Sequence, residues 1–404
     1  MHIVFIEPRF PTNQRQFIRG LAEVGATISA IGEGSKDSLD DELRHWLTHY
    51  EEVRNVCNEQ QVLDAVRFIQ RHKHVDRLEA VVEAHIMPCA HVREAAGIPG
   101  TTARTAFLCR DKPAMKEVLR AGGVPCAEST AAETAAEVRA FVERVGYPVI
   151  LKPRDGAGAS GATRVDSDAE LEPALRALGG NRSIAVEEFI EGHEGFFDTL
   201  TLRGQVVHEF ATHYYPNVLE AMRTRWISPQ FITTNRINEP GYDEVKAMAK
   251  KVVALLGIET SATHMEWFSG PKGLKFSEIG CRPPGVRAWD LYNVANDMDL
   301  YREWAMFMAH GRPGQYPSRR LAAGIIALRP DRDGRITHYE GLDAVRRVFG
   351  DSLIDWHLPP EGTPTQGVEA GYMANAWIRL KHENYDHLRH MLDLVGQTVH
   401  VRAS

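Results

Sequence analysis

The 404-residue sequence predicts a mixed α/β protein of several domains that begins with a doubly wound parallel α/β domain. Apolar runs at 2–6 and 27–31 flank an amphipathic stretch at 16–24, which is the order of a parallel β-α-β unit. Later in the chain, helical patterns alternate with pairs of strand-like runs, which is typical of α+β domains. At ~150 residues per domain, the chain is long enough for two to four domains.

Composition excludes several classes of protein. Hydrophobic residues make up 43% of the chain and charged residues 25%, which is the balance of a folded globular protein. The 47 Lys and Arg residues and the 54 Asp and Glu residues leave a net charge of −7. A mildly acidic chain is poorly suited to coat nucleic acid or an anionic membrane, so we expect neither as a partner.

The cysteines and the apolar segments indicate a cytoplasmic protein. The five cysteines are odd in number, widely spaced and free of CxxC, so we expect neither a disulfide framework nor a zinc knuckle. The apolar run at 2–6 meets Glu7 at once and is too short and too acidic for a signal peptide. Apolar stretches such as 321–328 hold fewer than half of the ~20 residues that span a bilayer.

The remaining elements follow in order along the chain. A buried strand at 78–82 ends at 83–85, which would face the carboxyl edge of the first sheet. The first strand–helix turn lacks GxGxxG, which argues against a dinucleotide site. The patterns predict further helices at 111–119, about 135–145, 243–256 and 385–394, and strands near 147–152, 162–165, 183–190, 196–202, 205–212, 263–268, 274–279, 322–328 and 372–380.

A loop of small residues at 155–161 is a candidate anion site. Small side chains, among them Gly158, Ser160 and Gly161, let backbone N–H groups approach phosphate oxygens closely. Lys152, at the end of the preceding strand, can place a point charge on the same phosphates. The loop lacks the GxxxxGK[ST] order of a P-loop, and taken alone it is better explained as a flexible surface loop between strands.

Two further segments carry charged residues at positions that could contact a ligand. Lys112 lies at the start of a helix, where a cation opposes the helix dipole, although a solvated lysine is the ordinary explanation. The segment 187–194 ends a strand in paired acids, which could offer backbone groups to adenine and a carboxylate to ribose hydroxyls. A solvated strand end is the alternative for this segment.

A predicted β-hairpin brings Glu266 and Glu278 together. If Phe268 opposes Leu274, both carboxylates and His264 project from the same face. The two glutamates are then diagonal neighbours ~7–8 Å apart and could share an ion. Mg²⁺ takes one or two protein carboxylates together with substrate phosphates, which fits this pair. A solvent-facing hairpin with scattered acids is the alternative.

Arg282 follows Glu278 by four residues and is held in a Pro/Gly turn. A guanidinium so close to two metal-binding carboxylates could bind a phosphate or a carboxylate as a bidentate fork. Weaker candidates for substrate contacts are His85, Arg287, Trp289 and 223–226.

The order of these motifs resembles the ATP-grasp superfamily and, within it, the L-amino acid ligases, which are close to the biotin-carboxylase type. The matching motifs lie at 110–112, 147–153 with its loop, 186–192, 263–266 and 276–282. The resemblance implies an α/β ATP-grasp protein in four parts. These are an amino-terminal α/β domain at 1–105, an ATP-grasp subdomain with a glycine-rich lid at 106–190, a central ATP-grasp domain at 191–318, and a carboxyl-terminal α+β domain at 319–404.

The resemblance also implies how a nucleotide is bound. Lys112 and Lys152 would hold the phosphates of ATP, and the loop at 155–161 would close over them as part of a lid. Glu187 would lie at the adenine amino group, and Glu194 at the ribose.

The same resemblance implies the metal and catalytic residues. Glu266 and Glu278 would bind Mg²⁺ or Mn²⁺. Arg282 would stabilise an acyl phosphate and its tetrahedral adduct, and His264 would line the acceptor pocket. Many family members carry Asn two residues after the second glutamate, where this chain has Gly280, so one ion is expected to be held by fewer ligands.

The expected function is an ATP-dependent carboxylate–amine ligase that joins two amino acids into a dipeptide or related amide through an acyl phosphate. Small-molecule amino acids are the expected partners, and a homodimer is a candidate assembly. One alternative is another ligase or carboxylase of the superfamily that acts on a sugar-linked amine, a thiol or bicarbonate. The other is a regulator that binds ATP without turnover, against which intact Lys152, Glu266, Glu278 and Arg282 argue.

Overall fold

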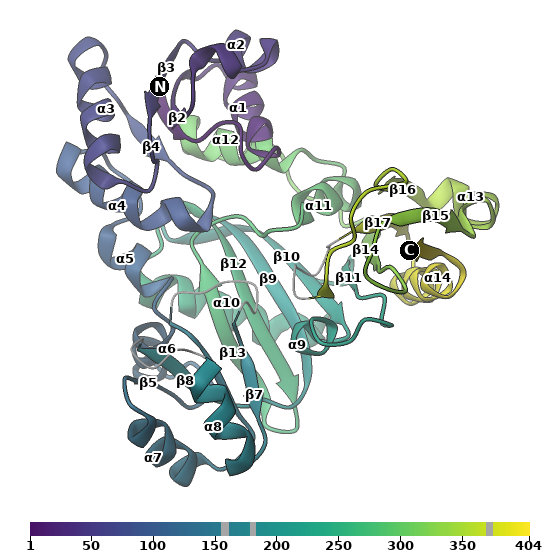
Figure 1. Cartoon of the computed structure of the whole chain (residues 1–404). Coiled ribbons are helices and arrows are strands. Elements are labelled where there is room, and N and C mark those ends of the chain that lie inside the picture. The colour runs from purple at the N-terminus through teal and green to yellow at the C-terminus, as the bar shows by residue number, and fades with distance from the viewer. Residues whose placement is uncertain (155–160, 178–182, 369–374) are drawn as a thin grey trace.

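The computed structural model describes residues 1–154, 161–177, 183–368 and 375–404 (Figure 1). It is a mixed α/β fold with a parallel sheet near the amino terminus and antiparallel sheets beyond, which confirms the predicted fold class. Four-stranded, eight-stranded and two-stranded sheets make up its β-structure. No helix in the described ranges is long and apolar enough to cross a membrane.

The first sheet is parallel, with the strand order β3-β2-β1-β4. Its strands are β1 (His2–Ile6), β2 (Thr27–Glu33), β3 (His49–Val53) and β4 (Arg77–Glu79). Helices α1 (Gln14–Glu23), α2 (Asp41–Trp46), α3 (Glu59–His72), α4 (Glu83–Ala96) and α5 (Ala103–Leu108) follow or connect them. Every residue of β1 is buried, because a parallel strand covered on both faces needs a continuous apolar run.

A second sheet has the order β5-β8-β6-β7 and lies in the lower lobe of Figure 1. Its antiparallel strands are β5 (Ser129–Ala132), β6 (Val149–Pro153), β7 (Thr163–Val165) and β8 (Ile184–Glu188). Helices α6 (Lys112–Ala121), α7 (Ala135–Val145) and α8 (Asp168–Ala177) accompany it. The predicted helix at 111–119 is therefore α6, with Asp111 as its N-cap.

The largest sheet is antiparallel, with the order β13-β12-β9-β10-β11-β14-β17-β16. Its strands are β9 (His193–Leu202), β10 (Gln205–Tyr215), β11 (Gln230–Thr233), β12 (Ser261–Gly270), β13 (Gly273–Gly280), β14 (Ala322–Leu328), β16 (Leu353–His357) and β17 (Ala376–His382). Because β11 pairs with β14, this sheet continues across the boundary predicted at residue 318. The four-part division of the chain stays a prediction.

The remaining elements cover or extend this sheet. They are α9 (Val218–Ala221), α10 (Asp243–Leu256), α11 (Ala288–Asn296), α12 (Leu300–His310), α13 (Leu342–Phe349), α14 (Tyr385–Thr398), and the paired strands β15 (Ile336–Glu340) and β18 (His400–Ala403). Helix α12 lies beside α1, far away in sequence (Figure 1). Phe17 of α1 stacks edge-on against Tyr301 and Trp304 of α12, which fixes the amino-terminal sheet to the large sheet.

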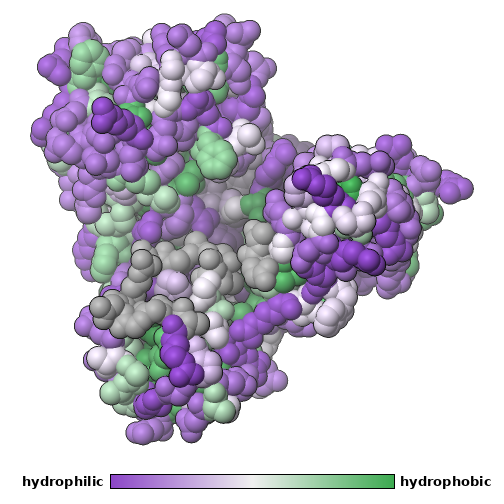
Figure 2. All heavy atoms as spheres, viewed as in Figure 1, coloured by the Kyte–Doolittle hydropathy of each residue, from purple (hydrophilic) through white to green (hydrophobic). Residues whose placement is uncertain are grey.

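In the view of Figure 2, which is that of Figure 1, hydrophilic residues cover most of the surface and a hollow lies between the upper and lower lobes. Hydrophobic side chains gather inside, in cores beneath each sheet. The small sheet and the β12–β13 end of the large sheet lie next to each other, and charged side chains converge between them.

Candidate functional site

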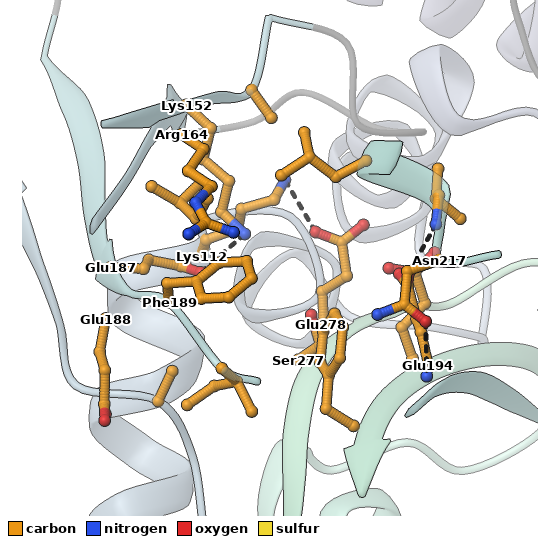
Figure 3. A pocket seen from close by; sticks show the side chains of 18 of the residues that line it. Lys112, Lys152, Arg164, Glu187, Glu188, Phe189, Glu194, Asn217, Ser277 and Glu278 are labelled. Atoms are coloured by element: carbon orange, nitrogen blue, oxygen red, sulfur yellow. Dashed lines mark hydrogen bonds and ion pairs between the residues drawn. The ribbon is translucent and has the colours of Figure 1, made fainter. Parts of the chain in front are cut away.

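A cavity of about 440 Å³ lies between the small sheet and the β12–β13 hairpin. Charged side chains from seven elements line it: Lys112 and Lys116 of α6, Lys152 of β6, Arg164 of β7, Glu187 of β8, Glu194 of β9, Glu266 of β12 and Glu278 of β13. Figure 3 shows Lys112, Lys152 and Arg164 on one side of the cavity, with Glu278 facing Lys112 and Glu194 beyond it. The structure therefore gathers in one place charges that span more than 160 positions of the sequence.

Glu266 and Glu278 are direct cross-strand partners, which corrects the predicted register. The hairpin turns on two residues only, so Phe268 pairs with Lys275 and not with Leu274. A bulge on β13 next to Glu266 then shifts the pairing and sets the two glutamates opposite each other. Directly opposed residues share a face of the sheet, so the predicted convergence of the two carboxylates is confirmed by a different register.

Lys112 is buried at the first turn of α6, and its Nζ lies 3.3 Å from Glu278 Oε2. The helix start is fixed because the carboxylate of Asp111 accepts the N–H of Ala114 at 3.0 Å and pairs with Arg154 at 2.7 Å. Since Arg154 follows β6 directly, this ion pair ties the start of α6 to the strand that carries Lys152. The helix position predicted for Lys112 is confirmed.

Glu187 joins two lysines. Its Oε1 lies 2.7 Å from Lys116 Nζ and its Oε2 lies 2.8 Å from Lys152 Nζ. Burial alone would raise the pKa of Glu187, but the two ammonium groups lower it to about 2. Burial opposes the charge of Lys152, while Glu187 and Glu278 raise the pKa of that lysine. The predicted contact of Glu187 with adenine stays a prediction.

Sequence reasoning missed Lys116. It lies one helical turn after Lys112, between Met115 and Leu119, which are both buried in the core. Positions four apart share a face of a helix, so the available signal was a lysine on the apolar face of α6.

Glu194 is 5% exposed, and its Oε2 accepts the N–H of Val218 at 2.7 Å. Its own N–H donates to Asn217 Oδ1 at 3.0 Å, so β9 and the start of α9 are joined here. Burial first, and then the charges of Glu266 and Glu278, raise the pKa of Glu194 to about 8. The ribose contact predicted for Glu194 stays a prediction.

His264 lies between two carboxylates. Its Nδ1 is 2.7 Å from Asp198 Oδ1, and its Nε2 is 3.7 Å from Glu266 Oε1. Burial opposes the charge of the imidazole, but Asp198 and Glu266 raise the pKa of His264 to about 9. The hydroxyl of Tyr292 donates to the other oxygen of Asp198. The predicted register, with Phe268 opposite Leu274, would set His264 opposite Glu278. That pairing is wrong, because the two-residue turn and the bulge place His264 opposite Gly280.

Asp198 was also missed from the sequence. It is 1% exposed and follows Phe196 and Phe197 in a buried stretch of β9, and a carboxylate next to two aromatic residues was the signal that could have found it.

Arg282 lies outside the wall of the cavity, next to the amino-terminal domain. Its Nε is 2.6 Å from Glu83 Oε2, and its Nη1 donates to the carbonyl of Pro283 at 2.8 Å. Glu83 is the first residue of α4, and its own carbonyl accepts a hydrogen bond from Arg110 at 2.7 Å. Helix α4 thereby holds the guanidinium beside the β12–β13 hairpin, and the catalytic role of Arg282 stays a prediction.

The other predicted residues are placed as follows. Gly158 and Ser160, and with them most of the predicted lid, lie outside the described residues; Gly161 has a φ of +72° just before β7. Arg223 lines the cavity, and Trp226 is 88% exposed. Trp289 packs in the core against Phe17 and Tyr301, Arg287 pairs with Asp290, and His85 is buried.

The donor set suits a hard divalent cation that is held in part by a substrate. Within the described ranges, no group of three or more His, Cys, Asp and Glu side chains could enclose a metal. Mg²⁺ commonly takes one or two carboxylates and completes its shell with phosphates and water. Glu266 and Glu278 fit that pattern; after burial, which is the larger cause, their negative charges also raise the pKa of Glu194.

Comparison with known proteins identifies the class. Residues 117–291 match the family model of the ATP-grasp domain, which confirms the resemblance seen in the motifs. The chain therefore contains an ATP-grasp domain and is an enzyme of the ATP-grasp ligase class.

Within that class, the chain is similar to L-amino acid ligases. It is 24% identical over 366 residues to the L-arginine-specific L-amino acid ligase of Bacillus subtilis, covering 88% of this chain and 87% of the relative. The crystal structure of an L-amino acid ligase from Bacillus licheniformis superposes with a TM-score of 0.78 at 17% identity, covering 100% and 98% of the two chains. N5-carboxyaminoimidazole ribonucleotide synthetase from Thermotoga maritima has the same fold, with a TM-score of 0.69, 15% identity and coverages of 100% and 99%.

Proposed function

We propose that this enzyme is an ATP-dependent carboxylate–amine ligase that joins two amino acids into a dipeptide or related amide and releases ADP and phosphate. The observation that carries the proposal is the cavity in which Glu266 and Glu278 oppose each other within reach of Lys112. A cavity lined by opposed carboxylates and a lysine suits a nucleoside triphosphate with a divalent cation. The similarity to an L-amino acid ligase over most of the chain supports amino acids as substrates.

The reaction has two steps. A carboxylate oxygen of the first amino acid attacks the γ-phosphorus of ATP, the bond to the β–γ bridging oxygen breaks, and ADP leaves. The amine of the second amino acid attacks the carbonyl carbon of the acyl phosphate and loses a proton, and phosphate leaves. Phosphoryl transfer depends on positioning and charge neutralisation, and the acyl phosphate must be kept from water.

Each charged group has a place in this scheme. Lys112 and Lys152 would neutralise the phosphates, and Glu266 and Glu278 would hold Mg²⁺ or Mn²⁺, which supplies further positive charge to the same oxygens. Arg282 would stabilise the acyl phosphate and its oxyanion adduct with a planar fork. His264, whose Nδ1 is fixed by Asp198, would present its other nitrogen to the acceptor pocket.

The test is substrate-dependent turnover. Purified enzyme is incubated with ATP, Mg²⁺ and every pair of the standard amino acids, and phosphate release and product masses are measured. We expect phosphate release with particular pairs only, together with a product whose mass is that of the pair less one water. Hydroxylamine should trap the activated acid as a hydroxamate. Turnover at the same rate with every amino acid or none, without hydroxamate, would contradict the mechanism.

A second candidate is a ligase or carboxylase of the same class that acts on another small carboxylate or amine. The observation that favours it is the likeness in fold to N5-carboxyaminoimidazole ribonucleotide synthetase over almost the whole chain. Bicarbonate-dependent ADP formation, without any amino acid requirement, would select this candidate. A chain that binds ATP but forms ADP with none of these substrates would instead be a nucleotide-binding regulator.

A further inference from the structure

The cavity wall contains a charged triad of Lys116, Glu187 and Lys152. Lys116 Nζ lies 2.7 Å from Glu187 Oε1, and Lys152 Nζ lies 2.8 Å from Glu187 Oε2. One carboxylate is thus shared by two ammonium groups, with one at each oxygen. The side chain of Lys116 is 1% exposed and that of Lys152 is 14% exposed, so Lys152 is the more accessible of the two lysines.

Packing does not explain the ammonium of Lys116. Its neighbours on α6, Met115 and Leu119, belong to the apolar core, and an apolar side chain would continue that core. A fully buried ammonium group is costly unless a charge and hydrogen bonds compensate it. The place of Lys116 against Glu187 therefore points to an electrostatic purpose.

The purpose follows from the charges of the triad. A carboxylate at 2.8 Å orients the ammonium of Lys152 but, alone, also cancels its attraction for an anion. With Lys116 at the other oxygen, the carboxylate is neutralised from behind and the triad keeps one net positive charge. Lys112 cannot supply this charge, because it faces Glu278 at 3.3 Å.

We propose that Lys116 is a positioning residue of the nucleotide site. By neutralising Glu187, it lets that carboxylate orient Lys152 without cancelling the charge that Lys152 presents to a nucleoside polyphosphate. This inference rests on the proposed function, since it takes the cavity to be a site for ATP. It gives Glu187 an electrostatic role in place of a contact with the adenine amino group.

The test compares nucleotide binding in the absence of amino acids, so it does not depend on which amide is formed. Calorimetric titration with MgADP, and competition with adenosine, are measured for wild type and Lys116→Met. We expect MgADP to bind about tenfold or more weakly in the variant, and adenosine to change by less than about twofold, because adenosine carries no phosphate. Lys246→Met removes the same charge outside the cavity, from a lysine paired with Glu209 at 3.5 Å, and should bind both ligands as wild type does.

A double-mutant cycle separates this role from a merely structural one. In Glu187→Gln the carboxylate that Lys116 neutralises is gone, so adding Lys116→Met should change the affinity for MgADP by less than about threefold. The double variant leaves no charge at the fully buried position 116, so it should fold even if Lys116→Met does not. Its affinity for MgADP is then compared with that of Glu187→Gln.

Three results would overturn the inference. The first is unchanged MgADP affinity in Lys116→Met. The second is an equal loss for adenosine and MgADP, which would mean that the cavity has collapsed. The third is a full-sized effect of Lys116→Met in the Glu187→Gln background. Failure of wild type to bind MgADP would refute the proposed function together with the inference, whereas normal wild-type binding with any of these three results would refute the inference alone.

Discussion

Replacing Glu278 with Gln keeps the shape of the side chain and removes one of two directly opposed carboxylates. Two unit charges 4 Å apart interact by about 4 kcal/mol at an effective dielectric constant of 20, so a divalent ion would lose about 8 kcal/mol of attraction. Water that takes the vacated position offsets part of this loss. Removal of one preorganised electrostatic contact typically lowers turnover by about 10²–10³, or about 2.7–4 kcal/mol, and we expect at least that much here.

Stability without ligand should change little. The variant deprives Lys112 of a partner at 3.3 Å but also relieves the repulsion between Glu278 and Glu266, so we expect a change of less than about 1 kcal/mol in the free energy of unfolding. When the MgADP concentration is 100 times its dissociation constant, binding should raise the free energy of unfolding of wild type by about 2.7 kcal/mol. The variant should lose most of that gain at the same MgADP concentration.

The assay follows ADP formation with a reactive amino acid pair across a series of Mg²⁺ concentrations, with thermal unfolding measured with and without MgADP. Glu209→Gln is the matched control, because it removes a carboxylate that is paired with Lys246 outside the cavity. Near-normal turnover of Glu278→Gln at low Mg²⁺ would refute the assignment of Glu278 as a metal ligand. A large loss of stability without ligand would show instead that the carboxylate is needed for folding.

Three other predictions follow from the structure. Arg282→Lys should retain MgADP binding but lose amide and hydroxamate formation by about 10²-fold or more, because an ammonium cannot reproduce the planar fork; equal losses in binding and turnover would contradict this. Burial, together with His193 and Arg389, lowers the pKa of His213 to about 3, so the unfolded chain takes up the proton first as the pH falls. The free energy of unfolding should therefore fall by about 1.4 kcal/mol per pH unit between pH 6 and 4. Urea titrations at several pH values should show that the free energy of unfolding of His213→Gln changes less steeply with pH. Gly20→Ala should destabilise by about 1–3 kcal/mol, since its Cβ would lie 2.6 Å from the carbonyl oxygen of Tyr301, whereas Gly241→Ala, with open space around it, should be tolerated.

Much of the fold could be predicted from the sequence because its signals are local. The apolar runs at 2–6 and 27–31 became parallel strands, and the helix expected at 111–119 ends at Ala121 before a pair of glycines. The hairpin that carries both proposed metal ligands, Glu266 and Glu278, was recognised from alternation alone. Side-chain period, capping residues and turn chemistry act over a few residues, so each can be seen without knowledge of the rest of the chain.

Tertiary structure alone decided how these residues meet. The alternation pattern could not show that a two-residue turn and a bulge would set Glu266 against Glu278, because a slip by one residue moves every side chain to the other face. The partners Lys116 and Glu187, and likewise Glu83 and Arg282, lie on elements distant in sequence. The ion-pair partner of each buried charged side chain depends on how those elements pack. A buried ammonium or carboxylate is stable only beside a partner that the fold brings to it.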